Sequence, residues 1–453
     1  MVVPPGRLRG QSRILTALDP GPRRRAAVPF RLKRAWLLGA AAALCWTGVM
    51  LSVPAFTGAA ISPLETTTPP IQRVSGHWIG VWGASPRPWV PFRPNLDNQT
   101  IRQLVRINGG GSQIRLRLSN EYGSKPLVIG EVHVALPAGF GGMVMPGSDH
   151  VVTFSSSKSV SIPAGSSVFS DPIAMDVKPL TSFAVSIYLP VDTGLCTCHL
   201  LALQTGYVTG HGNFTGTPIL IGARSFLLRA FLTEVDAQAE AKAVVTFGDS
   251  LTDGYGSMPD RNHRWPDRLA ERLSVRAHGK WGVVNAGIAG NQLLTDGDGE
   301  AAVVRFGRDV LGVPGVSHVI VLLGINDLGH GYGPPPPDAS AAVKPPTYDD
   351  MLAGYRQLIV QAHAHGVKIY AATLTPFKGA VYWSPAGEAL RQRINRWIRT
   401  SPEWDGFVDF DATWRDPAQP AQIRDGLGAP DQLHGSDAGY VALADAVPLS
   451  IFN

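Results

Sequence analysis

Four short polar segments in the C-terminal half of the chain hold residue types that together could hydrolyse an ester. They read FGDSLTDG around Ser250, NAGIAGN around Gly290, LLGINDLG around Asn326, and DQLHGSDAGY around Asp431 and His434. Ser250 can act as the nucleophile and His434 as the base that takes its proton. Asp431, three residues before His434, can orient the imidazole from within one loop.

The same segments offer donors for the negative charge that develops on a carbonyl oxygen under attack. Asn326 can donate from its side-chain amide, and Ser250 and Gly290 can each donate a backbone N–H. Gly290 suits this role because a residue without a side chain lets a substrate oxygen approach the backbone closely. His330, in GHGYG, and Asn291, next to Gly290, are candidates for contact with the substrate.

His434 is the predicted base because Asp431 precedes it by three residues within one loop. His318 opens an expected strand, and His363 lies late in an expected helix, where a cation favours the helix dipole. Asp249 and Asp253 flank the nucleophile, and we expect them to hydrogen-bond the turn and not to carry protons.

From Ala241 onward, strand and helix patterns alternate five times, which predicts a parallel sheet covered on both faces. The apolar runs expected to form strands are Val244–Phe247, a run from Val283, His318–Leu323, Val367–Leu374 and Phe407–Phe410. The helical patterns between them include one with Pro266 near its start, Met351–Ala362 and Leu390–Ile398. Ligands in such sheets bind beyond the carboxyl ends of the strands, and each polar segment follows such an end.

Residues 71–235 show the period of two that is typical of β-strands. Ile114, Leu116 and Leu118 alternate with Arg115 and Arg117, and Gly, Pro and Asn clusters separate similar short runs. This predicts an antiparallel β-sandwich ahead of the hydrolase-like part, residues 241–453. Its arginines could form a row that binds a ligand, but we expect them to lie on the solvent-exposed face of the strands. This row is Arg102, Arg106, Arg115 and Arg117.

The first 60 residues have the order of an export signal, and residues 61–70 read as a Pro-rich linker. Nine Arg or Lys and one Asp in residues 1–60 give a charge of +8, against +5 for the whole chain, so the remainder carries −3. That remainder has no general attraction for nucleic acid. The uncharged apolar run after Arg34 is also long enough for an uncleaved membrane anchor. We therefore expect a secreted or periplasmic protein that touches a membrane only through this segment, if it is retained.

Cys196 and Cys198 form a C-x-C pair followed by His199. Zinc sites need a second ligand pair at suitable spacing, which this segment lacks. A local disulfide or two loop thiols is the expected state, and no metal site is predicted.

The four polar segments, in this order, resemble those of the SGNH hydrolases, the superfamily that contains the GDSL esterases and lipases. The Ser, Gly, Asn and His of the family's four blocks fall on Ser250, Gly290, Asn326 and His434, and the family's acid falls on Asp431. The resemblance covers residues 241–453 and implies a flavodoxin-like three-layer α/β/α domain with a five-stranded parallel sheet. It also implies an acyl-enzyme mechanism without metal or organic cofactor. Gly435 departs from the Pro that many members carry after the His.

Three functions remain open on the sequence. The first is a serine esterase that deacylates a carbohydrate polymer, which suits an exported protein with an accessory domain. The second is a lipolytic acylhydrolase acting on glycerides or phospholipids. The third is an envelope glycan-binding protein in which the hydrolase domain is vestigial. The Pro-rich insert from Gly333 to Pro346 is expected to wall the site in each enzymatic case.

Overall fold

A computed structural model describes residues 77–88, 96–139, 141–276, 280–334 and 344–453. The expected leader, residues 1–60, and linker, residues 61–70, lie outside the described residues. In the described ranges, none of the helices combines the length and apolar character that crossing a membrane requires.

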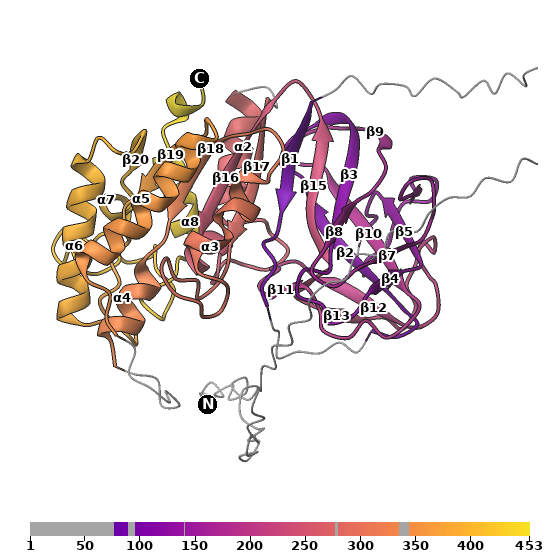
Figure 1. Ribbon diagram of the computed structural model, residues 1–453, viewed down its shortest axis with the longest axis horizontal. Helices are drawn as coiled ribbons and strands as arrows, with labels where there is room; N and C mark the ends of the chain where they lie inside the picture. Colours follow the sequence, from indigo (N-terminus) through magenta and orange to yellow (C-terminus); the bar gives the residue numbers. More distant parts are fainter. Residues whose placement is uncertain (1–76, 89–95, 140, 277–279, 335–343) are drawn as a thin grey trace, which may run out of the picture. The chain divides into compact units, whose positions relative to one another are not determined.

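The C-terminal part is built on a five-stranded parallel sheet, as the alternating pattern predicts (Figure 1). The strand that leads to Ser250, β16, pairs with β17 on one side and β18 on the other, and β19 and β20 complete the sheet. The strand bounds are β16 Lys242–Gly248, β17 Trp281–Gly287, β18 Val316–Leu322, β19 Lys368–Ala372 and β20 Gly406–Val408.

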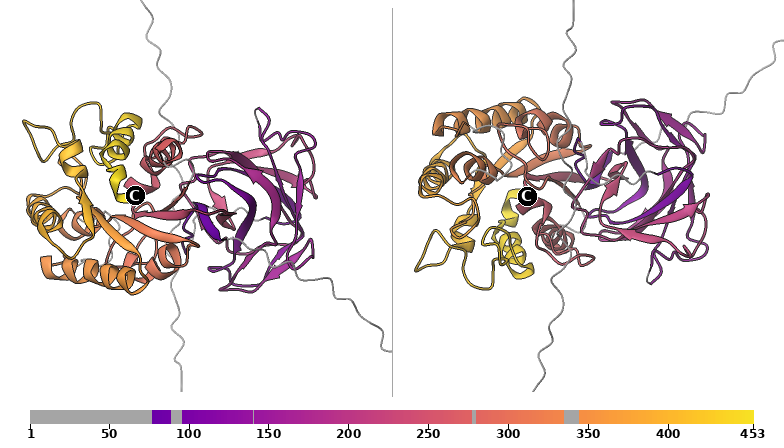
Figure 2. Two further views of the ribbon diagram at one scale, coloured as in Figure 1. Left: turned by 90° about the horizontal axis from the view of Figure 1, so that it is seen from above. Right: turned by 90° about the horizontal axis from the view of Figure 1, so that it is seen from below.

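Successive residues of β16 bury their side chains in different apolar layers. Val245 and Phe247 pack in the layer that includes α5 and α6, whereas Val244 packs with α2 and α8 on the opposite face (Figure 2). Helices on both faces explain why the strand is apolar throughout. The helices are α1 Ser250–Asp253, α2 Trp265–Arg276, α3 Ala302–Phe306, α4 Ile325–Tyr332, α5 Tyr348–Ala364, α6 Pro385–Thr400, α7 Phe410–Trp414 and α8 Asp437–Ala446, with a π-helical turn at Gly307–Leu311 and a 3₁₀ turn at Leu449–Phe452.

The preceding part is β-rich and antiparallel, which confirms the expected class. One sheet has the order β1-β15-β3-β8, with β9 also paired to β3, and a six-stranded sheet has the order β13-β12-β2-β10-β5-β6. Both contribute to one apolar core. The bounds are β1 Trp78–Gly83, β2 Gln99–Arg106, β3 Gly111–Ser119, β4 Leu127–Ile129, β5 Glu131–Ala135, β6 His150–Val152, β7 Val160–Ile162, β8 Ser167–Phe169, β9 Ile173–Val177, β10 Ser182–Leu189, β11 Cys198–His199, β12 Gly206–His211, β13 Arg224–Phe226, β14 Arg229–Ala230 and β15 Leu232–Gln238.

The expectation that the arginine row faces solvent is wrong. Arg102 is fully buried, and its guanidinium donates to the Ser186 hydroxyl at 2.7 Å and to backbone carbonyls of neighbouring loops. Arg115 and Arg117 pair with the buried carboxylates of Asp236 and Glu234 on β15. Because apolar and Arg residues alternate along the strands, the arginines lie on the face opposite the apolar core. The alternation does not show that loops and acidic side chains cover this face as well.

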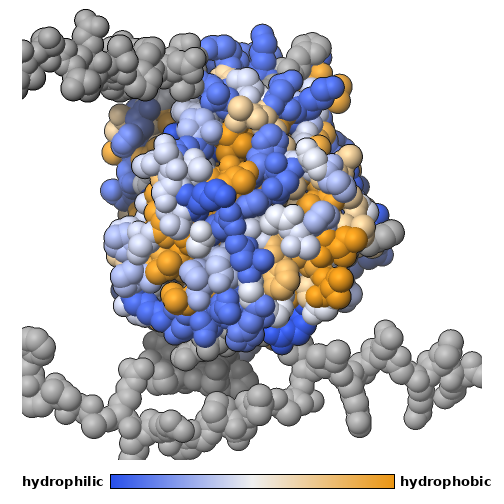
Figure 3. Space-filling view, turned by 90° about the vertical axis from the view of Figure 1, so that its right-hand side faces the viewer, coloured by the Kyte–Doolittle hydropathy of each residue, from blue (hydrophilic) through white to orange (hydrophobic). Residues whose placement is uncertain are grey.

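The outer face of the β-rich part presents mixed chemistry. Figure 3 shows hydrophilic residues over much of this face, with apolar residues in separate groups between them. Exposed apolar side chains that occur singly are usual on globular proteins and need no partner.

Candidate active site

Ser250 lies directly beyond the carboxyl end of β16, at the first position of α1. Asp249 caps this short helix, because its carboxylate accepts the backbone N–H of Leu251 at 3.0 Å. A side chain at Gly248 would collide with Thr252 and the Leu322 carbonyl, so only glycine fits the end of the strand. The backbone around Ser250 is therefore held from both sides.

Ser250, His434 and Asp431 form one continuous chain of hydrogen bonds. The His434 Nε2 lies 2.8 Å from the Ser250 Oγ, and the His434 Nδ1 lies 2.6 Å from the Asp431 Oδ2. The other Asp431 oxygen accepts the backbone N–H groups of Leu433 and His434, which fixes the carboxylate within its loop. This arrangement lets the imidazole take a proton from the hydroxyl while the carboxylate holds the ring.

The surroundings keep the imidazole neutral and its acid ionised at neutral pH. Burial lowers the pKa of His434 below its usual value, and the hydrogen bond and charge of Asp431 only partly oppose this. Burial disfavours the ionised form of Asp431, but hydrogen bonds from the His434 ring and from two backbone N–H groups outweigh it, so the pKa of Asp431 is lowered. Neutral imidazole is the form that a general base requires.

We expect the acid limb of the kcat/KM profile to have its midpoint below the ordinary histidine pKa of about 6.5. The midpoint is displaced to lower pH because the pKa of His434 is lowered, so the base stays unprotonated to lower pH. The profile is measured on p-nitrophenyl acetate. Asp431→Asn should lower the plateau and shift the limb to lower pH, because it removes a charge that raises the pKa of His434.

An acid limb with its midpoint near pH 7 would contradict the assignment of the limb to His434 and would indicate Asp249 as the titrating group. Burial raises the pKa of the Asp249 carboxyl to about 7. An Asp249→Asn variant separates the two groups, because it would abolish a limb due to Asp249 and leave one due to His434 in place.

The three predicted oxyanion donors are the N–H groups of Ser250 and Gly290 and the Asn326 amide. In the described residues, neither the Ser250 N–H nor the Gly290 N–H donates to another protein group. Gly290 has φ +78°, a left-handed conformation, and any side chain there would collide with the Asp298 carboxylate. Both facts require glycine at this position.

The Asn326 amide is held in one orientation. Its Nδ2 donates to the Asn291 carbonyl at 2.9 Å, and its Oδ1 accepts the Tyr382 hydroxyl at 3.2 Å. One amide hydrogen remains for a substrate oxygen, since an NH₂ group carries two. Tyr382 gives no signal in the sequence, because it follows Asn326 by 56 residues and lies in a loop.

The two candidates for substrate contact have different surroundings. The Asn291 side chain is fully buried, donating to the Glu300 carbonyl and accepting from Arg305, so it supports its own loop. His330 is exposed on α4, with its ring 5.7 Å from that of Tyr382.

The sequence reasoning missed two side chains that support the site. Tyr255 packs its ring against His434, with 4.3 Å between the ring centroids, and it lies only five residues after Ser250. Arg305 is buried and donates to the carbonyls of Gly248 and Ala286, next to the nucleophile and the Gly290 loop. An arginine inside a helical pattern gives no hint of this role.

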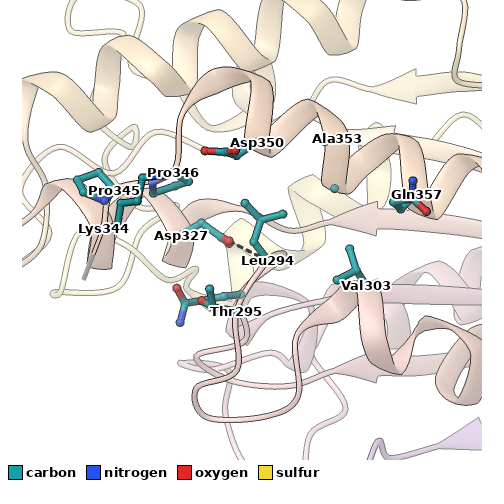
Figure 4. Close-up of a pocket in the computed structure, with 12 residues that line it drawn as sticks. Leu294, Thr295, Val303, Asp327, Lys344, Pro345, Pro346, Asp350, Ala353 and Gln357 are labelled. Carbon is teal, nitrogen blue, oxygen red and sulfur yellow. Dashed lines mark hydrogen bonds between the residues drawn. The ribbon is translucent and has the colours of Figure 1, made fainter. Parts of the chain in front are cut away.

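A cavity of about 510 Å³ lies beside the site (Figure 4). Asp327 points toward the backbone at Leu294, and its carboxylate accepts the N–H groups of Leu293 and Leu294. Pro345 and Pro346, the described end of the Pro-rich insert, line the cavity, while residues 335–343 lie outside the described residues. None of the triad residues lines it.

Cys196 and Cys198 are bonded to each other as a disulfide. Across the described ranges, no three His, Cys, Asp or Glu side chains are grouped so that they could hold a metal ion.

Slightly less than half of the chain is similar to several solved structures. An acetylxylan esterase from Geobacillus stearothermophilus is 22% identical over 46% of this chain and 93% of its own, with a TM-score of 0.36. A lipase/acylhydrolase from Enterococcus faecalis is 18% identical over 46% and 93%, with a TM-score of 0.34. A GDSL-like lipase from Bacteroides thetaiotaomicron is 16% identical over 47% and 88%, with a TM-score of 0.34. None of the curated proteins matches the chain.

Residues 246–442 match the model of the GDSL-like lipase/acylhydrolase family. This range contains all four polar segments and the whole of the parallel sheet except the first residues of β16. Residues 246–442 are thus a GDSL-like lipase/acylhydrolase domain.

Proposed function

We propose that this protein is a serine esterase that cleaves carboxylic esters through an acyl-enzyme intermediate. The observation that carries the proposal is the unbroken chain from Asp431 through His434 to the Ser250 Oγ. The Ser250 oxygen attacks the ester carbonyl while His434 takes its proton. His434 then gives that proton to the leaving alcohol, and the acyl group stays on Ser250.

Water completes the reaction in the second half. His434 takes a proton from the water as its oxygen attacks the acyl carbon, and the proton passes to Ser250 as the acid leaves. In both halves the oxyanion would accept hydrogen bonds from the N–H groups of Ser250 and Gly290 and from the Asn326 amide. These donors act strongly because they are fixed before the charge develops.

For the substrate, we propose a short acyl group on a carbohydrate. The loop that carries Gly290 continues through the exposed polar residues Thr295 to Asp298, which suit an alcohol rich in hydroxyl groups. The Tyr255 ring packs on His434 yet is 46% exposed, so it offers an aromatic face on which a sugar ring can stack.

A lipolytic acylhydrolase is the second candidate. Met258, three residues after Tyr255, is 55% exposed, and Val381, next to Tyr382, is 86% exposed. Apolar side chains exposed near the triad suit a long acyl chain, because contact with it removes both surfaces from water.

A series of p-nitrophenyl esters from acetate to palmitate distinguishes these candidates. We expect the highest kcat/KM on acetate, together with acetate release from acetylated xylan or pectin. Preference for acyl chains of eight carbons or more would favour the lipolytic alternative. No hydrolysis of any ester, together with glycan binding, would contradict the esterase proposal and favour the glycan-binding alternative.

A further inference from the structure

The loop that carries Gly290 is held by contacts from the β-rich part of the chain. We call residues Ala289 to Glu300 the oxyanion loop, and Cys196 to His199 the CTCH segment. The CTCH segment belongs to the β-rich part, because its last two residues form β11, which pairs with β14. Three contacts connect the CTCH segment to the oxyanion loop. One goes through Asp253, which binds the loop, and two go directly to residues of the loop.

The first contact runs through Asp253, the last residue of the helix that begins with Ser250. One Asp253 oxygen accepts the Ala289 N–H at 2.9 Å, directly before Gly290. The other oxygen lies 3.1 Å from the His199 Nε2. Asp253 therefore joins the nucleophile's helix to the oxyanion loop, and His199 holds the carboxylate from the other side.

His199 is surrounded by oxygen atoms. Its Nδ1 lies 2.9 Å from the Ser85 carbonyl oxygen, and its Nε2 faces the Asp253 carboxylate and, at 3.3 Å, the Leu201 carbonyl. The His199 and Asp253 side chains are both buried, so the contact between them is costly to lose.

The second and third contacts reach the far end of the loop. Arg87 donates to the Asp298 carboxylate at 2.9 Å, and this is the carboxylate that lies against Gly290. The Arg87 backbone N–H is in turn bonded to the Cys198 carbonyl. The Tyr122 hydroxyl donates to Glu300 at 2.7 Å, and the Tyr122 N–H is bonded to the Thr197 hydroxyl.

We propose that His199 is a positioning residue for ester hydrolysis. It holds Asp253 so that the Ala289 N–H is fixed and the Gly290 N–H points at the developing oxyanion. The Cys196–Cys198 disulfide and the β11–β14 pairing keep His199 in place. On this view the β-rich part completes the active site and is not only an attached binding module. The inference rests on the proposed function, since it assumes that Ser250 and Gly290 act as described there.

The test compares His199→Ala with His199→Gln in the full chain on p-nitrophenyl acetate. We expect His199→Ala to lower kcat by about 10–100-fold with little change in KM, because a misplaced catalytic group costs turnover and not binding. His199→Gln should keep most of kcat, since its amide can still donate to Asp253 from nearly the position of Nε2. Asn326→Ala, expected to lose about 10²–10³-fold, gives the scale for losing one oxyanion donor.

Arg106→Ala is the matched control. Arg106 also joins the β-rich part to the hydrolase domain, donating to Glu271 on α2 at 2.9 Å, but it contacts no residue of the oxyanion loop. We expect it to leave kcat unchanged even where it lowers the melting temperature. An equal loss of kcat in Arg106→Ala and His199→Ala at equal melting temperature would overturn the inference.

The result also separates the inference from the proposed function. If Ser250→Ala is inactive and His199→Ala keeps full kcat, the positioning role is wrong and the esterase proposal stands. If Ser250→Ala keeps the activity of the wild type, the proposed function fails, and the positioning role fails with it.

Discussion

Ser250→Ala should lower the hydrolysis of p-nitrophenyl acetate by a factor on the order of 10⁶, since removal of a serine nucleophile leaves only binding and oxyanion stabilisation. The protein should remain folded. The lost hydroxyl makes one hydrogen bond, to His434, and such a bond contributes about 1 kcal/mol to the free energy of unfolding. Initial rates, corrected for spontaneous hydrolysis, and a thermal melt measure both quantities.

Ser257→Ala is the control for this experiment. Ser257 is a buried serine in the turn after α1, and its hydroxyl donates to the Gly254 carbonyl at 2.8 Å. The same substitution there should leave kcat close to that of the wild type. If Ser250→Ala kept more than about a hundredth of the wild-type rate, another group would have to be the nucleophile, because binding and oxyanion donors alone cannot supply that rate.

The parts of the site that share one loop or follow the strands of the parallel sheet could be predicted. Asp431 and His434 share one loop, so a spacing of three residues already implies contact. Ser250, Gly290 and Asn326 each follow an apolar run, and parallel strands bring their carboxyl ends to one edge of the sheet. The fold follows from the same periodicity, which is why the five strands of the parallel sheet were predictable.

The supporting contacts could not be predicted, because they join residues that are distant in sequence and ordinary in type. The Tyr382 hydroxyl orients Asn326 across 56 residues, and no pattern marks a loop tyrosine for this role. His199 lies in β11 and contacts Asp253, the last residue of α1, across 54 residues of sequence. A C-x-C-H segment suggests a metal site or a disulfide and gives no sign of a contact with the helix that begins at Ser250. The sequence predicts that Arg102 lies on the surface, because alternation of apolar and polar residues distinguishes the two faces of a strand. It does not show that other residues cover the polar face, where Arg102 is buried.

His434→Ala should reduce activity as much as Ser250→Ala, on the order of 10⁶-fold, whereas Asp431→Asn should cost about 10⁴-fold. The reason for the difference is that His434 transfers the proton, while Asp431 holds the ring in the required tautomer. An Asn at position 431 would donate to Nδ1 where the carboxylate accepts from it, so the ring hydrogen would lie on Nε2, which then could not accept the Ser250 proton. The double variant Ser250→Ala with His434→Ala should lose no more than either single one, because the two act as a unit.

A second histidine–aspartate pair in the same domain provides the control for this prediction. His263 lies 2.5 Å from the Asp437 carboxylate, which also accepts the Met258 N–H, and it makes no hydrogen bond to Ser250 in the described residues. His263→Ala therefore removes a similar pair near the site without removing the base, and kcat should change little. If His263→Ala lost as much activity as His434→Ala, or if His434→Ala kept a hundredth of the wild-type rate, His434 would not be the base. The kinetics thus separate the histidine that exchanges protons with Ser250 from one that only anchors a loop.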